Sequence, residues 1–184
     1  MNHTIIDHLE SYLGTIERGW GELKLQVAKF AGAPDKGVST FCTLGLSRTP
    51  LPMRDGRLVR QELLVSVAAR YQDSAVAGFL LAFSEYVLSK NRALLRGDVV
   101  GPAAPLIPGV LASAVYCAMP VFFPDEFATF RGSDPPTVLV WLVPQPAAEA
   151  EFARRVGWDR YETTLEEGEV DFWNLDRPPV VGGG

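Results

Sequence analysis

An uncharged apolar run near the C-terminus constrains the fold more than any other feature of this sequence. Residues 137–143 are rich in β-branched and aromatic side chains and contain no charge, a composition typical of a strand that is covered on both faces. Two prolines precede the run, and Pro144 is expected to end it because proline has no N–H to donate within a sheet. We therefore predict a buried strand over these residues.

Two short helices are predicted directly after this strand. The first opens at Pro146, since proline lacks only an N–H that the first helical turn leaves unpaired, and it ends at Gly157. The second follows at once and ends at Gly168. Apolar side chains recur at helical spacing in both, namely Ala148, Phe152 and Val156 in the first and Trp158, Tyr161 and Leu165 in the second.

The remaining elements follow from capping residues and periodicity. Thr4 and Asp7 have the spacing of a capping box, so a first helix is expected to run to Gly14. The longest helix is expected to begin near residue 73 and to end at Asn91. Strands are predicted over residues 22–30, 38–46, 60–68 and 113–118.

The order of these elements predicts the fold class. Strands and helices do not alternate strictly, which disfavours a doubly wound parallel sheet. We predict an α+β fold: a single domain over residues 1–181, with a mixed, mostly antiparallel sheet and helices packed on one face of it. Residues 182–184 are expected to form a frayed C-terminal tail.

Charge and apolar content narrow the class of protein. The net charge of −5 disfavours nucleic-acid binding, because that affinity comes largely from clustered Lys and Arg. The first residues lack the basic leader and apolar core of a secretion signal, and the most apolar long stretch, residues 75–88, is too short to span a bilayer. We therefore predict a cytoplasmic protein without nucleic-acid or membrane partners, whose oligomeric state the sequence leaves open.

The sequence contains no recognisable catalytic or metal-binding motif. His3 and His8 do not share a helix face, so structural roles are expected for both. Cys42 and Cys117 lie in separate apolar strands and are expected to be buried, reduced thiols. Ser47 does not complete a nucleophile elbow, because a threonine replaces the second glycine of that motif. We predict that the protein is not an enzyme and requires no cofactor or metal.

An acidic segment is the remaining option for chemistry or for binding. Glu162, Glu166 and Glu167 belong to it, and no Lys or Arg occurs between Tyr161 and Asp171. Acid–base catalysis needs carboxylates in unlike environments, one of them partly dry, whereas these acids are predicted to be uniformly exposed. A solvated helix face is one interpretation, and an electrostatic docking patch for a basic partner is the other.

Two further segments have both a structural and a binding interpretation. The first carries several aromatic residues among prolines and suits either core packing or an exposed patch for a protein partner: Phe122, Phe123, Phe127 and Phe130. The second is the Gly-Leu-Ser-Arg loop at residues 45–48, which forms either a stiff turn or a recognition loop.

Structural roles are predicted for two groups of charged residues. Arg96 and Asp98 are expected to pin a turn by charge-assisted hydrogen bonds, with a positive φ at Gly97 between them. Arg177 is expected to act as a latch for the C-terminal segment.

Several short motifs, taken together and in order, resemble the bacterial suppressor-of-fused domain family: Gly19-Trp-Gly21, Thr43-Leu-Gly-Leu-Ser47, Arg60-Gln-Glu-Leu63, Leu95-Arg-Gly-Asp-Val-Val-Gly101, Pro105-Leu-Ile-Pro108, Phe122-Phe-Pro-Asp125 and Phe127-Ala-Thr-Phe130. The resemblance covers nearly the whole chain. In the family's animal members a Gly-Leu-Ser run also follows a strand, and the region near it helps to clasp an extended peptide of a transcription factor by strand addition. The resemblance therefore implies partner contacts near Phe41, Thr43, Leu46, Ser47 and Arg48.

The same resemblance implies a protein-binding function. Many bacterial members of the family are regarded as immunity proteins, so we predict a non-enzymatic domain that binds and occludes a toxin, with Glu162, Glu166 and Glu167 steering a basic partner. One alternative is an intracellular scaffold that sequesters a host protein. The other is a carboxylate-dependent hydrolase, which requires at least two of these acids to converge in a pocket, one of them partly buried.

Overall fold

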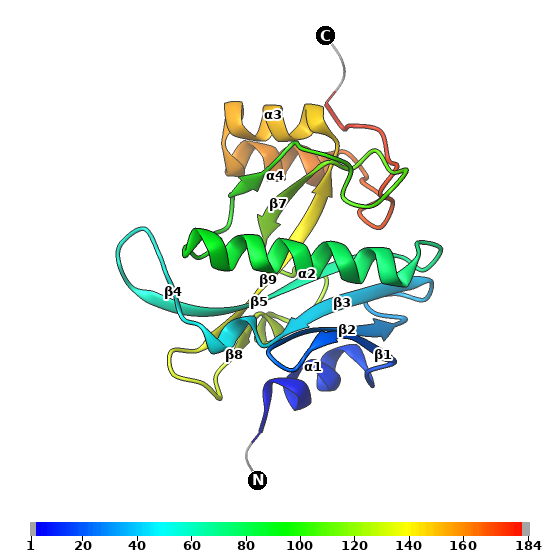
Figure 1. Ribbon diagram of the computed structural model, residues 1–184. Coiled ribbons are helices and arrows are strands. Elements are labelled where there is room, and N and C mark those ends of the chain that lie inside the picture. Colours follow the sequence, from blue (N-terminus) through cyan, green and yellow to red (C-terminus); the bar gives the residue numbers. More distant parts are fainter. Residues whose placement is uncertain (1–2, 182–184) are drawn as a thin grey trace.

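A mixed sheet organises the residues that the structure describes, 3–181, in this computed structural model (Figure 1). The strand order is β1-β2-β3-β5-β9-β7-β6, with β4 paired to β5 and β8 paired to β9. Only β5 and β9 run parallel; the other described pairs are antiparallel. The strands are β1 (Arg18–Glu22), β2 (Leu25–Ala31), β3 (Val38–Leu44), β4 (Leu51–Pro52), β5 (Leu58–Ala68), β6 (Val99–Val100), β7 (Ala114–Ala118), β8 (Thr129–Phe130) and β9 (Thr137–Gln145).

The predicted α+β class, with a single domain and a mostly antiparallel mixed sheet, is confirmed by this arrangement. The helices are α1 (Ile5–Leu13), α2 (Asp73–Lys90), α3 (Ala147–Val156) and α4 (Trp158–Glu167), with single 3₁₀ turns at η1 (Leu46–Arg48) and η2 (Asp125–Ala128). None of the described helices is both long and apolar enough to cross a membrane. The predicted frayed tail, residues 182–184, lies outside the described residues.

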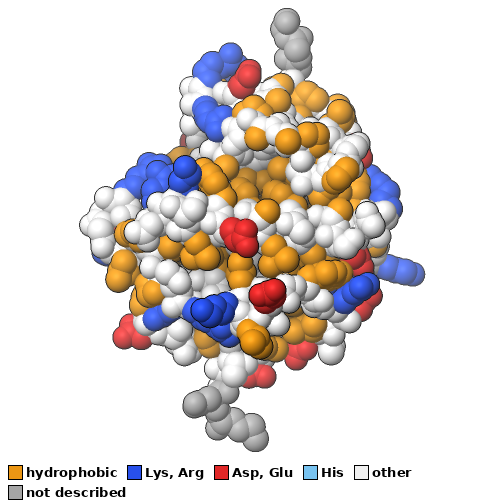
Figure 2. Space-filling view, viewed as in Figure 1, with side chains coloured by type: hydrophobic (Ala, Val, Ile, Leu, Met, Phe, Trp, Pro, Cys, Tyr) orange, Lys and Arg blue, Asp and Glu red, His pale blue; other side chains and the backbone are white. Residues whose placement is uncertain are grey.

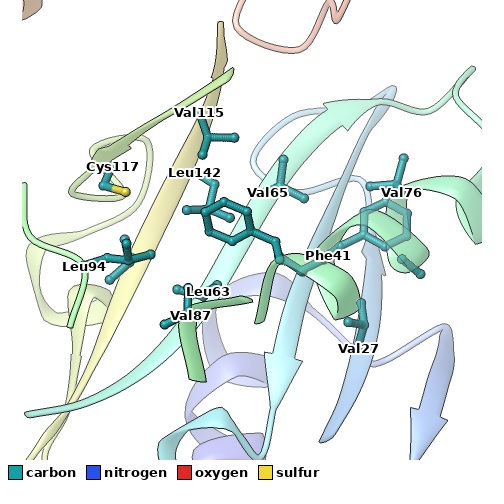
Figure 3. Close-up of a cluster of buried hydrophobic side chains, with 14 of the residues drawn as sticks. Val27, Phe41, Leu63, Val65, Val76, Val87, Leu94, Val115, Cys117 and Leu142 are labelled. Carbon is teal, nitrogen blue, oxygen red and sulfur yellow. The ribbon is translucent and has the colours of Figure 1, made fainter. Parts of the chain in front are cut away.

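Helices cover both faces of the sheet, so the prediction that they cover one face is wrong. Helix α2 crosses one face (Figure 1), where its side chains Val76 and Val87 join Phe41 and Leu63 in one hydrophobic core (Figure 3). On the other face, α1, α3 and α4 pack on a second core. Two-sided packing follows from β9 and the second half of β5, residues 63–68, whose largely apolar side chains leave neither face suited to water.

The face that carries α2 also has an apolar hollow. Hydrophobic side chains gather there between α2 and the end of the molecule that carries α3 (Figure 2). Most charged side chains in this view lie around the hollow rather than in it (Figure 2). The candidate site described below belongs to the opposite face, since it is lined by residues of the second core.

Strand β9 is buried on both faces as predicted, but it continues through Pro144 to Gln145. The prediction that Pro144 ends the strand is wrong for a local reason. The register between β5 and β9 ends at Trp141, so at Pro144 the strand pairs with β7 alone. Proline is tolerated where one strand edge needs no donor.

Helix ends are the most accurately predicted features. Thr4 and Asp7 form the expected capping box of α1, and Asn91 ends α2 in the left-handed conformation with φ 46°. The structure corrects the strand predicted over residues 22–30. Strand β2 begins only at Leu25, and Leu23 lies at the exposed tip of a hairpin with the unpredicted strand β1.

Both cysteines are free and buried, as predicted from their apolar surroundings. Burial raises the pKa of the Cys42 thiol, and a nearby Glu62 carboxylate adds to the effect. Burial likewise raises the pKa of Cys117. Neither thiol is therefore activated as a nucleophile at neutral pH.

Candidate partner-binding pocket

An open cavity of about 430 Å³ is lined by aromatic and aliphatic side chains on the face of α4. We call it the aromatic pocket. It combines two segments that the sequence suggested separately, the aromatic run after β7 and the acidic helix near the C-terminus. Strands β7 and β9 contribute Tyr116, Ala118, Trp141 and Val143, the chain after β7 contributes residues 119–125, and α4 contributes Glu162, Leu165 and Glu166.

A tight turn presents the aromatic run to the pocket. The N–H of Phe123 donates to the carbonyl of Pro120 over 3.1 Å, which folds the chain back on itself between two prolines. Phe122 is left 43% exposed, whereas Phe127 and Phe130 are buried, Phe127 in the second core. Core packing is therefore confirmed for Phe127 and Phe130, whereas a partner contact at the exposed Phe122 stays a prediction.

A hydrogen-bonded carboxylate lies at the charged side of the pocket. Glu162 accepts hydrogen bonds from Arg96 Nε (3.0 Å) and Tyr116 Oη (2.6 Å), and Arg96 Nη2 also donates to it. The Arg96 guanidinium stacks 4.5 Å from the ring centroid of Trp158. The side chain of Glu162 is only 19% exposed, so the prediction that these acids are uniformly exposed is wrong for Glu162. Glu166 and Glu167 are exposed as predicted.

The turn after α2 delivers Arg96 to this position. Gly97 has φ +90°, as predicted, and a Cβ placed on it would lie 2.8 Å from Cβ of Trp158. Asp98 pins the turn by accepting from the N–H of Leu95 over 2.8 Å. Arg96, which was expected to bond within the turn, instead reaches α4 and connects two distant segments.

This geometry fulfils the structural requirement of the hydrolase hypothesis, that two acids converge in a pocket and one of them is partly buried. Glu162 and Glu166 both line the pocket, and Glu162 is partly buried. Burial alone would raise the pKa of Glu162, but the hydrogen bonds from Arg96 and Tyr116 outweigh it and leave that pKa below its usual 4.5. Glu162 is therefore ionised at neutral pH and already has hydrogen-bond donors, which does not suit a general acid.

The hydrogen bonds that Glu162 accepts from Arg96 and Tyr116 predict a pH-dependent contribution to the free energy of unfolding. Because folding lowers the pKa of Glu162, the stabilisation is fully present above pH 4.5 and is lost as the pH falls below 4.5 through the folded-state pKa. Urea unfolding between pH 7 and pH 3 should show Glu162→Gln destabilised at pH 7, with the gap to the wild type narrowing as the pH falls below 4.5. Glu167→Gln, on an exposed site of the same helix, is the control. A gap that stays constant across this range would contradict the assignment.

The loop at residues 45–48 folds around a second buried carboxylate, Glu62. Glu62 accepts hydrogen bonds from the hydroxyl of Thr43, the N–H of Gly45 (2.9 Å), and both the N–H (3.1 Å) and hydroxyl (2.7 Å) of Ser47. Burial raises the pKa of Glu62, and these hydrogen bonds oppose the rise without reversing it. The loop is thus a rigid turn held from beneath by β5.

The structure separates the residues predicted to contact a partner at this loop. Phe41, Thr43 and Leu46 are at most 1% exposed and belong to the interior, so their side chains offer no surface to a partner in this structure. Ser47 is partly buried, and Arg48 is exposed and donates to the carbonyl of Leu23 over 3.0 Å. Partner contact at the loop stays a prediction, carried by Ser47 and Arg48. The loop does not line the aromatic pocket.

Sequence reasoning missed Glu62, Tyr116 and Phe172 as members of these sites. The sequence does carry a signal for Glu62, which directly precedes the mostly apolar residues 63–68. A single acid next to a buried strand is expected to be buried too and to need hydrogen-bond donors around it. Tyr116 and Phe172 carry no comparable signal, because each acquires its role only when distant segments meet.

The histidines and possible metal ligands add no further site. His8 is 7% exposed, and its Nε2 lies 3.0 Å from the carbonyl oxygen of Phe127, so its role is structural as predicted. Within residues 3–181 there is no group of three or more His, Cys, Asp or Glu side chains placed to hold a metal ion.

Comparison with known proteins identifies the fold. A crystal structure described as that of a suppressor of fused homolog from Neisseria gonorrhoeae superposes with a TM-score of 0.79 at 14% identity, covering 100% of this chain and 98% of that one. A Sufu–Fu complex gives 0.72 at 15% identity over 96% and 90% of the two chains. Drosophila Suppressor of Fused gives 0.63 at 16% identity, over 85% of this chain and 42% of its own length.

Sequence comparison shows the family directly. A search of curated proteins finds no match to the chain. The family model described as "Suppressor of fused protein (SUFU)" matches residues 21–178, which include every strand from β2 to β9, both carboxylate sites and the aromatic pocket. The predicted resemblance is therefore confirmed, and the chain belongs to the suppressor of fused family.

Proposed function

We propose that the protein is a non-enzymatic protein-binding domain that neutralises a bacterial toxin by binding it and occluding its active cleft. The aromatic pocket is the observation that supports this most. Met119, Val121 and Phe122 are 49%, 71% and 43% exposed within one stretch of four residues, an apolar surface that a partner would cover. One similar fold is known in a Sufu–Fu complex, which supports a protein as the partner.

Occlusion requires only a preformed surface, and the elements around the pocket are well anchored. Strands β7 and β9 supply its sheet residues, and the Arg96–Glu162 pair fastens α4 to the turn after α2. A surface that is already ordered loses less conformational entropy on binding. No step in this mechanism makes or breaks a covalent bond, and it needs no cofactor. The action is proposed to take place in the cytoplasm of the producing cell.

Co-expression tests this function. The protein should restore growth to cells that express the toxin domain encoded beside its gene, and the two should elute together in size-exclusion chromatography. Rescue without a complex, or a purified domain that retains no protein from its own organism, would sink the proposal. A stable complex with a protein encoded elsewhere, without protection from any toxin, would instead support the scaffold alternative.

The hydrolase alternative has one observation in its favour, the convergence of Glu162 and Glu166 on one pocket. It predicts turnover of a small substrate that Glu162→Gln and Glu166→Gln each abolish. The binding proposal predicts no turnover, with Glu166→Gln altering only the affinity for the partner.

Charge on α4 should control the rate of association. The double variant Glu166→Lys/Glu167→Lys reverses two exposed acids, so association with a basic toxin should slow roughly tenfold at low salt, with a smaller effect at 0.5 M salt. The control Glu85→Lys/Glu151→Lys makes the same change in net charge on exposed sites of α2 and α3. Equal association rates for both double variants in stopped-flow measurements would refute steering by α4 while leaving the binding function intact.

A further inference from the structure

The apolar side of the aromatic pocket is preorganised. Phe122 meets Trp141 edge-to-face with ring centroids 5.3 Å apart, and it meets Phe172 at 5.6 Å and Trp173 at 4.8 Å. Trp141 and Phe172 also contact each other at 5.4 Å. Rings held by such mutual contacts lose little freedom when a ligand arrives. The volume of about 430 Å³ suits one large side chain or a ligand of similar size.

The charges around the pocket are unbalanced. Four charged side chains line it, and the one cation, Arg96, is paired with Glu162. The other two are Asp125 and Glu166, both exposed, and within the described residues neither forms an ion pair. We call Asp125 and Glu166 the negative rim of the pocket. A negative rim beside an apolar cavity favours a ligand that carries an apolar group next to a positive charge.

From these two features we infer that the aromatic pocket takes a single large apolar side chain of the partner, such as Trp, Phe or Leu, next to a Lys or Arg in the partner's sequence. The apolar side chain enters the cavity and packs against the wall formed by Phe122, Trp141 and Phe172, and the cation meets Glu166 and Asp125 at the rim. This inference rests on the proposed function and adds to it the chemistry that the partner must present. An acidic segment is rejected, because it would place like charges together.

Short peptides test the inference without the natural partner. The probes are three blocked tetrapeptides, GWKG, GWEG and GAKG, titrated into isotope-labelled full-length protein. GWKG should give saturable NMR shifts at the indole N–H of Trp141, with Trp20 on β1 unaffected. GWEG should bind roughly fivefold more weakly at low salt, and GAKG should not saturate. Equal binding of GWKG and GWEG, or shifts confined to Trp20, would overturn the inference.

Variants test the contributions of the apolar side chains and of the negative rim separately. Phe122→Ala should weaken GWKG binding roughly tenfold. Met119→Ser/Val121→Ser changes only exposed side chains and should weaken it without risk to folding. Glu166→Lys should abolish the preference for GWKG over GWEG, whereas Glu151→Lys on α3 should retain it. Retention of the preference in Glu166→Lys would refute the role of the rim.

The same variants distinguish failure of this inference from failure of the proposed function. If Phe122→Ala and Met119→Ser/Val121→Ser bind the toxin as tightly as the wild type and still protect cells, the pocket assignment is wrong and the function stands. If the wild type itself retains no protein partner and protects no cell, the proposed function is wrong even where GWKG binds.

Discussion

Replacing Arg177 by alanine should lower the free energy of unfolding by about 3–5 kcal/mol. Arg177 is 4% exposed and Glu149, at the start of α3, is fully buried. Arg177 Nη1 and Nη2 donate to the two carboxylate oxygens of Glu149 over 2.5 and 2.8 Å, and Tyr161 Oη donates over 2.8 Å. Removing the guanidinium would leave a charged carboxylate in the interior with too few donors. Urea denaturation measures the loss.

Two comparisons make this prediction specific. Arg160→Ala removes an exposed arginine from α4 and should change the stability by less than about 0.5 kcal/mol. The double variant Glu149→Leu/Arg177→Met removes both charges and should recover much of the stability, since apolar replacements of a buried pair are often neutral. A loss below 1 kcal/mol in Arg177→Ala would contradict the latch that ties the C-terminal segment to α3.

Replacing Phe41 by alanine should cost about 3–5 kcal/mol while leaving the partner affinity of the folded protein unchanged. Phe41 is 0% exposed and lies in the core beneath α2 (Figure 3). Its ring centroid is 5.9 Å from that of Trp20. Its loss leaves a cavity between the sheet and α2. Thermal unfolding measures the cost, and titration of the toxin at a temperature where the variant is folded measures the affinity.

Ser47→Ala and Arg48→Ala provide the contrast to Phe41→Ala. Arg48 is exposed and can contact a partner directly, so Arg48→Ala should spare stability. Ser47→Ala removes one donor from Glu62 and should cost about 1–3 kcal/mol. A stable Phe41→Ala variant that no longer binds would show that Phe41 becomes accessible on binding, against its burial in this structure.

The sequence predicts local features of this fold well because those features have local causes. The capping box at Thr4, the end of α2 at Asn91 and the two-sided burial of β9 each depend on residues adjacent in the chain. Strand β1 was not predicted because it has no such local cause. It contains glycines and exposed charges, carries no alternation, and forms only because β2 folds back beside it.

The candidate site is less predictable because its chemistry arises between segments. The sequence identifies Glu162 and Phe122 as members of two separate features, and only the tertiary fold shows that both line one pocket. Glu162 looked exposed because its own helix is acidic, while the two donors that cover it come from residues 46 and 66 positions earlier in the chain. Charge on neighbouring residues could not reveal them.

The parallel pairing of β5 with β9 affects how the protein emerges from the ribosome. Strand β9 is the last strand made, and it joins β5 to β7 across the sheet. The edge of β5 that pairs with β9 stays unpaired from the translation of Ala68 until that of Gln145. This interval lasts roughly 4–15 s at typical elongation rates. An unpaired apolar strand is prone to aggregate during such an interval. Slow or interrupted translation between these residues should therefore lower the yield of soluble protein more than the same delay after Gln145.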